Sequence, residues 1–192
     1  VTFPKSVGQI PFNFPHKPSS QIDGGKNPGT KGDMSRVNGA LYPFGYGLSY
    51  TTFEYSDINI SPKVITPNQK VQARCKVTNT GKRAGDEVVQ LYVSAPDAAD
   101  ANKPEKELKA FAKTKELKPG EATVVTLKVN AADLASYDEA ASAWVVTPGN
   151  YKFLVGASSR DIKATLEAEV AAATQKTNNI LKLQEPMSLL KR

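Results

Sequence analysis

Cysteine and histidine are almost absent from this chain of 192 residues, which has one of each, Cys75 and His16. A single thiol cannot form a disulfide within the chain, and one cysteine with one histidine cannot assemble a typical metal site. Apolar and polar residues alternate from Val71 to Val77, which places Cys75 on the apolar face of a predicted strand. We therefore interpret Cys75 as a small buried hydrophobic residue rather than a nucleophile, and we expect neither a metal ion nor a cofactor.

Long apolar runs are absent as well. Hydrophobic residues make up 40% of the chain and charged residues 23%, as in ordinary globular proteins, and no apolar run is long enough to cross a bilayer. The formal net charge of +6 is spread along the chain, and lysines are interleaved with glutamates between Glu105 and Lys118. Such mixing is typical of a solvated face. We therefore expect neither a membrane nor a nucleic acid as a partner.

The N-terminal part of the chain has little periodic apolar signal. It opens on Val1-Thr2-Phe3-Pro4 without an initiator methionine, so we expect a piece of a longer protein. Prolines and glycines are dense from residue 11 to residue 38, which predicts an extended linker along the surface of a neighbouring domain. His16, within this linker, either packs on that surface or touches a ligand held by another domain. The run from Gly24 to Lys31 is not a phosphate loop, because Gly-Thr-Lys stands where that loop needs Gly-Lys-Ser or Gly-Lys-Thr.

Short alternating runs separated by turn residues begin at Phe53. They predict eight strands: Phe53–Ser61, Lys70–Thr78, Glu87–Ser94, Leu108–Leu117, Ala122–Asn130, Ser142–Val146, Tyr151–Ala157 and Ile162–Val170. One helical turn is predicted over Ala131–Tyr137. The strands have one apolar and one polar face, which favours an antiparallel β-sandwich, although the periodicity is also compatible with a small barrel. The fold class is therefore all-β.

The C-terminal segment, Thr174–Arg192, carries several large apolar residues around Pro186. A helix across that proline would lose a backbone hydrogen bond and clash with the preceding turn. We therefore expect an extended tail that lies over an apolar groove.

Aromatic residues and glycines are concentrated from Leu41 to Phe53, where the linker meets the first strand. The glycines allow the backbone to turn, and four aromatic side chains offer large amphipathic surfaces. These four are Tyr42, Phe44, Tyr46 and Phe53. They are too many for the core of one small domain, so we predict that they form a contact with another domain.

The same run resembles the start of the C-terminal fibronectin type III-like domain of family 3 glycoside hydrolases, the β-glucosidase family. Further stretches are similar to that family in the same order. Val1–Pro11 is similar to the last strand of the family's α/β sandwich domain, Lys106–Phe111 and Leu117–Glu121 to central strands, and Thr147–Tyr151 and Val155–Ile162 to the final hairpin. The resemblance implies the end of an α/β sandwich domain over residues 1–13, a linker over 14–46, a fibronectin type III-like β-sandwich over 47–172 and a tail over 173–192.

The resemblance also implies what the chain lacks. The family's nucleophile is an aspartate in a Ser-Asp-Trp context on a barrel domain, and its acid/base glutamate lies in the α/β sandwich domain. Here Ser56-Asp57 is followed by Ile58, and the only tryptophan is Trp144. No catalytic residue is therefore assigned to this chain, and no substrate-binding residue is identified.

Paired carboxylates are the groups that glycoside hydrolysis requires, about 5 to 9.5 Å apart according to mechanism. The candidate acids are Asp86, Glu87, Asp97, Asp100, Asp133, Asp138, Glu139 and Asp161. Each lies in a predicted turn, loop or strand edge, where acids commonly cap turns or increase solubility. We expect none of them to be catalytic.

Two hypotheses of different classes follow. In the first, the chain is the non-catalytic C-terminal portion of a retaining β-glucosidase, which hydrolyses terminal β-linked glucosyl residues. Its partners are then the barrel and α/β sandwich domains of the same enzyme, which it braces, and the carbohydrate substrate only indirectly, through a loop bordering the cleft. The resemblance favours a periplasmic or secreted location. In the second, the chain is a free-standing fibronectin-like carbohydrate-binding or adhesion module.

Overall fold

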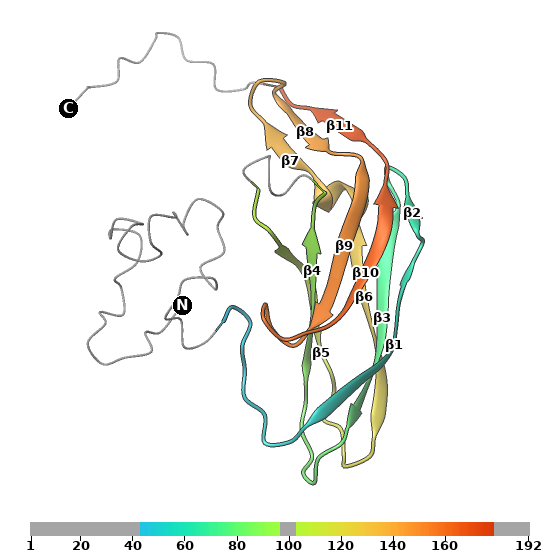
Figure 1. Ribbon diagram of the computed structural model, residues 1–192, viewed down its shortest axis with the longest axis vertical. Coiled ribbons are helices and arrows are strands. Elements are labelled where there is room, and N and C mark those ends of the chain that lie inside the picture. The colour runs from blue at the N-terminus through green and yellow to red at the C-terminus, as the bar shows by residue number, and fades with distance from the viewer. Residues whose placement is uncertain (1–42, 97–102, 179–192) are drawn as a thin grey trace, which may run out of the picture.

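The computed structural model of the protein describes residues 43–96 and 103–178. Within these ranges the chain forms eleven strands and one 3-10 helix (Figure 1). The elements are β1 (Phe53–Ser61), β2 (Val64–Ile65), β3 (Lys70–Asn79), β4 (Val88–Ser94), β5 (Glu107–Lys113), β6 (Ala122–Asn130), η3 (Ala131–Leu134), β7 (Ser136–Asp138), β8 (Ala143–Val146), β9 (Gly149–Gly156), β10 (Ile162–Val170) and β11 (Ala173–Lys176). The all-β class predicted from the alternating sequence is confirmed. No helix of the described residues is long and apolar enough to span a membrane.

Two sheets form the layers of the sandwich. One has the strand order β1-β3-β6 and the other the order β2-β10-β9-β4-β5, while a third, small sheet has the order β11-β8-β7. Neighbouring strands pair antiparallel, except that β2 runs parallel to β10 over two residues. The small sheet projects at one end of the long axis of the molecule (Figure 1). Each sheet ends in edge strands, so the small closed barrel that the periodicity allowed is wrong.

The hydrophobic core lies between the two larger sheets. Strand β3 follows strict alternation, because its buried residues face the core and the residues between them face solvent. Cys75 is only 2% exposed and belongs to this core, as the alternation predicted. Burial raises the pKa of its thiol to about 11, so the reactive thiolate is scarce at neutral pH.

Strand β4 is buried at nearly every position rather than at alternate ones. Val89, Leu91 and Val93 face the core of the sandwich. Gln90 and Tyr92 point to the opposite face of the sheet, yet they are 5% and 2% exposed. Another part of the chain must therefore cover the outer face of the sheet at this strand.

The predicted strand positions hold best where the alternation is long. The bounds of β1, β6 and β10 agree with the prediction residue for residue. Strand β5 ends at Lys113 and not at Leu117, because Leu117 leaves the strand and pairs with Gly85 in an isolated bridge.

The short strands β2, β7 and β11 were not predicted. The helical turn predicted over Ala131–Tyr137 is confirmed only up to Leu134, because Tyr137 lies in β7 and pairs with Trp144 of β8. Strand β11 lies in the segment predicted as an extended tail and pairs with β8. Residues 1–42, which include His16, Tyr42 and all but the last four residues of the predicted linker, lie outside the described residues, as do Asp97, Asp100 and residues 179–192.

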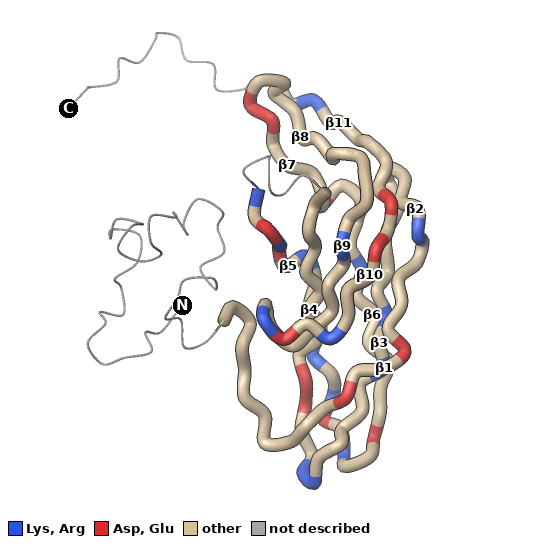
Figure 2. The backbone as a smooth tube through the Cα atoms, viewed as in Figure 1, with Lys and Arg blue, Asp and Glu red and all other residues tan. Residues whose placement is uncertain are grey.

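Charged residues of both signs are intermixed over the strands (Figure 2). Between Glu105 and Lys118, where the sequence predicted a solvated mixed face, Lys109 pairs with Glu107 at 2.5 Å. Lys115 of the same stretch pairs at 2.8 Å with Glu121, which lies just beyond it. The more exposed pair, Lys115 with Glu121, contributes little to stability, because solvent screens it.

Candidate functional site

Residues 43–52, which we call the docking segment, carry a series of exposed large side chains. Phe44 and Tyr46 are 54% and 45% exposed, and Leu48 and Tyr50 are 85% and 91% exposed. Single exposed apolar residues are common on protein surfaces, but several in succession are typical of an interaction site. The segment leads into β1 along the side of the sandwich (Figure 1).

The docking segment begins with a β-turn from Pro43 to Tyr46. The amide of Tyr46 donates a hydrogen bond to the carbonyl of Pro43 at 3.1 Å. Gly45 has φ +76°, whereas Phe44 has no positive φ, and this combination defines a type II turn with glycine at its third position. A Cβ atom at Gly45 would lie 2.0 Å from Oε1 of Gln90, so the position requires glycine for space as well as for backbone conformation.

Buried polar side chains of β4 hold this turn against the sheet. Nε2 of Gln90 donates to the carbonyl of Gly45 at 2.8 Å and to that of Ala157 at 2.6 Å. Oε1 of Gln90 accepts a hydrogen bond from the hydroxyl of Tyr92 at 2.5 Å. The amide of Ser159 donates to the carbonyl of Phe44 at 2.9 Å. Every polar atom of the Gln90 side chain is thus bonded, which makes its burial favourable and fixes the turn in place.

The other end of the docking segment is tied to Asn79, which is fully buried. Oδ1 of Asn79 accepts from the hydroxyl of Thr51 at 2.7 Å, and Nδ2 donates to the carbonyls of Arg83 and Leu117, each at 2.8 Å. The amide of Thr80 donates to the carbonyl of Thr52 at 2.9 Å. Leu48 and Tyr50 therefore lie between two hydrogen-bonded anchors while their side chains face outward.

Phe53 does not belong to this exposed group. It is partly buried and packs against the hydrophobic core. The prediction of an inter-domain contact was therefore wrong for Phe53, because the alternation of β1 directs its side chain inward. Phe44 and Tyr46 are as exposed as that prediction requires.

Two of the candidate acids form exposed ion pairs. Asp86 lies 2.5 Å from the ammonium of Lys113, and Asp161 lies 2.7 Å from that of Lys163. The hydrogen bond from Lys113 lowers the pKa of the Asp86 carboxyl. A carboxylate held ionised in this way is a poor general acid.

Other candidate acids organise turns. Asp133 accepts hydrogen bonds from the backbone amide of Asn130 at 3.1 Å and from its side chain at 2.7 Å, at the start of η3. Asp138 accepts from the amide of Ala141 at 3.0 Å, and Glu139 is exposed. Asp57 of the Ser-Asp-Ile sequence is exposed at an irregularity of β1 and has φ 51°. Asp133 and Asp138 therefore have structural roles in separate turns.

Glu87 is the candidate acid with the least ordinary surroundings. Burial raises the pKa of its carboxyl, while the hydrogen bond that it accepts from the amide of Val88, at 2.8 Å, acts in the opposite direction. Burial likewise raises the pKa of Tyr55, whose hydroxyl is buried without a hydrogen-bond partner among the described residues. A raised pKa alone does not make a catalytic acid, because glycoside hydrolysis needs a second carboxylate across the substrate.

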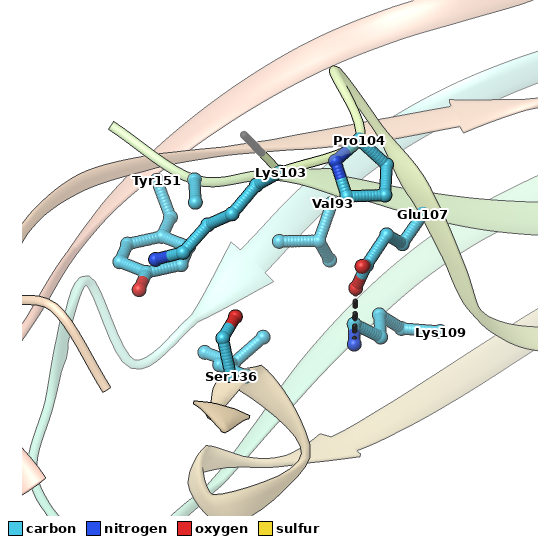
Figure 3. Close-up of a pocket in the computed structure, with 9 residues that line it drawn as sticks. Val93, Lys103, Pro104, Glu107, Lys109, Ser136 and Tyr151 are labelled. Atoms are coloured by element: carbon cyan, nitrogen blue, oxygen red, sulfur yellow. Dashed lines mark ion pairs between the residues drawn. The ribbon is translucent and has the colours of Figure 1, made fainter. Parts of the chain in front are cut away.

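A small cavity between β4, β5, η3 and β9 offers no such pair (Figure 3). Its volume is about 20 Å³, room for one water molecule. Glu107 is the one acid among its lining residues and is neutralised by Lys109. The described residues also contain no group of three or more His, Cys, Asp or Glu side chains that could hold a metal ion.

The sequence predicts the exposure of Phe44 and Tyr46 but not the side chains that anchor the docking segment, Gln90 and Asn79. A weak signal existed for Gln90, because it interrupts the apolar run Val88–Val93 with a polar residue. For Asn79 the turn sequence Asn-Thr-Gly indicated only a loop.

Comparison with known proteins identifies the sandwich. A family model described as a fibronectin type III-like domain matches residues 87–159. The chain is 38% identical over 165 residues to the periplasmic β-glucosidase of Salmonella typhimurium, a match that covers 85% of this chain and 21% of that protein. It is 37% identical over 165 residues to a putative β-xylosidase of Formosa agariphila, which covers 86% of this chain and 20% of that protein.

A solved structure gives the same result. The structure of β-glucosidase 3B from Thermotoga neapolitana in complex with glucose superposes with a TM-score of 0.67 and 44% identity, covering 76% of this chain and 19% of that one. The chain thus spans about a fifth of the length of these relatives, in which it matches part of a larger single polypeptide. The chain matches the C-terminal region of family 3 glycoside hydrolases, the region that carries a fibronectin type III-like domain.

Proposed function

We propose that the protein is the non-catalytic C-terminal portion of a retaining β-glucosidase that hydrolyses terminal β-linked glucosyl residues. One observation carries this proposal: a segment rich in exposed aromatic residues is held to the sandwich by hydrogen bonds. The chain as a whole corresponds to only about a fifth of the length of its relatives. Rigid presentation of an apolar surface is what a permanent contact with another domain needs, because little conformational entropy is then lost on docking.

The docking segment rests against the barrel and α/β sandwich domains of the complete enzyme. Phe44 and Tyr46 are the main contacts, because the turn that holds them is hydrogen-bonded to β4. The contribution to catalysis is indirect. A cleft wall displaced by about 1 Å can slow a reaction on the order of 100-fold, so a braced domain can affect turnover without touching substrate.

The chemistry itself belongs to other domains. Asp86 and Asp161 pair with lysines, and Asp133 and Asp138 accept hydrogen bonds from backbone amides in turns, which supports a non-catalytic role. The location named for the Salmonella relative supports a periplasmic or secreted location for this protein.

The test compares the purified 192-residue chain with the complete enzyme on an aryl β-glucoside. We expect turnover by the complete enzyme and none by the chain. Asp161→Asn and Glu87→Gln serve as controls in the chain, because both keep the size of the side chain. Turnover that persists through purification and disappears with either substitution would contradict the proposal.

A further inference from the structure

An exposed aromatic pair lies on the small sheet, away from the docking segment. Tyr137 of β7 is paired in register with Trp144 of β8, and Trp144 with Gln175 of β11. Directly paired residues of neighbouring strands project from the same face of a sheet. Tyr137, Trp144 and Gln175 therefore form one row across three strands, which we call the aromatic row.

The two rings form a corner. Their centroids are 5.4 Å apart and their planes meet at 65°. Tyr137 is 47% exposed and Trp144 is 46% exposed, so neither ring is absorbed by the core. Edge-to-face contact stabilises the corner beyond the effect of burial, and it leaves ring surface open to solvent.

Polar groups surround the rings. The hydroxyl of Tyr137 lies 3.4 Å from that of Thr177, which donates to the carbonyl of Ser142 at 2.8 Å. The indole N–H of Trp144 and the side-chain amide of exposed Gln175 make no hydrogen bond within the part of the chain that the structure describes. A ligand with both apolar C–H faces and hydroxyl groups could stack on the rings and form hydrogen bonds with the polar groups around them.

We propose that the aromatic row is a binding site for a single β-linked oligosaccharide chain. A pyranose ring can stack its C–H face on one aromatic ring while its hydroxyls bond to the indole N–H, the amide of Gln175 and the hydroxyl of Thr177. The angle between the rings selects the form of the ligand. Crystalline cellulose presents a flat surface and needs coplanar rings, whereas a corner accepts one chain. The β linkage rests on the proposed function.

The position of the aromatic row keeps it open. The small sheet lies at one end of the long axis, whereas the docking segment approaches β1 near the other end (Figure 1). A domain that contacts only the docking segment would therefore not cover the aromatic row. The row would hold the glycan close to the enzyme, outside the catalytic cleft.

The fluorescence of Trp144 tests the proposal directly, because it is the only tryptophan of the chain. Cellotetraose and xylotetraose are titrated into the 192-residue chain, with α-linked maltotetraose as the comparison sugar. We expect a saturable change in Trp144 fluorescence with at least one β-linked sugar and a response to maltotetraose at least about tenfold weaker. Crystalline cellulose should not retain the chain.

Substitutions test whether the sugar binds at the aromatic row. Trp144→Ala, followed by calorimetry, should weaken binding at least about tenfold. Tyr137→Phe keeps the ring and should retain the stacking part of the affinity. Phe111→Ala is the matched control, because Phe111 is 68% exposed on β5 and outside the row; it should leave binding unchanged.

Three results would overturn the proposal. The first is no response to any β-linked sugar, the second is equal affinity for maltotetraose, and the third is equal loss of binding in Phe111→Ala and Trp144→Ala. If Trp144→Ala destabilises the complete enzyme but not the isolated chain, and no sugar binds, the row is an inter-domain contact instead. Failure of the proposed function is distinguishable, because the aryl β-glucoside assay does not depend on this site.

Discussion

Substitution of Gly45 by alanine should detach the docking segment from the sandwich. Gly45 has φ +76°, a conformation that costs an alanine about 1 to 2 kcal/mol. The new methyl group would lie 2.0 Å from Oε1 of Gln90 and 2.8 Å from the hydroxyl of Tyr92. Both side chains are buried, so neither can move aside without breaking the hydrogen bonds that hold the turn.

The energetic consequence follows from these contacts. If Gln90 moves, at least one buried polar group loses its partner, at a cost of about 1 to 3 kcal/mol. Together with the backbone strain, the penalty is about 2 to 5 kcal/mol. A peripheral turn with few other contacts detaches locally when the penalty exceeds its docking free energy. We therefore expect local opening of the turn, with a smaller change in global stability.

Amide hydrogen exchange at Ser159 reports this opening, because Ser159 donates to the carbonyl of Phe44. A penalty of about 2 kcal/mol should speed exchange on the order of 30-fold. Gly47→Ala is the matched control, since a Cβ atom at Gly47 meets nothing within 4 Å. Exchange at Ser159 that is unchanged in Gly45→Ala, or accelerated equally by Gly47→Ala, would refute the anchoring role of Gln90.

Three further predictions concern the interior of the sandwich. Cys75 should react slowly with a thiol reagent at pH 8 and rapidly in denaturant, because burial raises its pKa to about 11; rapid native labelling would mean that the register of β3 is wrong. Asn79→Ala should lower the free energy of unfolding by about 2 to 4 kcal/mol, since it leaves buried partners unpaired, and a loss below about 0.5 kcal/mol in urea unfolding would contradict this. The pKa of the Glu87 carboxyl is raised in the folded state, so the folded protein binds this proton more tightly than the unfolded chain does. The free energy of unfolding should therefore fall as the pH rises from the ordinary carboxyl range through the pKa of the folded state. Glu87→Gln should remove this fall, and an unchanged slope in a pH series of unfolding curves would show that Glu87 is not its source.

The sequence predicts those parts of the fold in which local pattern and tertiary structure agree. Strands β1, β6 and β10 are nine residues each, long enough for period-two alternation to mark both ends. Strands β2 and β7 have two and three residues, too short for any alternation to be visible. They form because neighbouring strands offer free backbone hydrogen-bonding groups. Those groups come together only in the assembled sheet, so the local sequence does not predict these strands.

The candidate sites likewise divide into features that the local sequence predicts and features that depend on tertiary structure. The exposure of Phe44 and Tyr46 could be predicted, because a small core cannot accommodate so many aromatic residues. The corner of Tyr137 and Trp144 could not, since it depends on the register of β7 against β8. The burial of Gln90 was equally inaccessible, because a polar side chain is buried only when its partners are in place.

The central claim is that the docking segment joins the sandwich to the rest of the enzyme, and Phe44→Ala tests it most directly. Phe44 is 54% exposed in the isolated domain, so truncation there should cost at most about 1 kcal/mol of the free energy of unfolding. If the same side chain is buried at the interface of the complete enzyme, as we propose, the cost should rise to about 3 to 5 kcal/mol. The measurement is the stability of the 192-residue chain and of the complete enzyme, each with and without the substitution. A penalty found mainly in the complete enzyme is the result that the account predicts, and an equal penalty in both would show that Phe44 serves only its own domain.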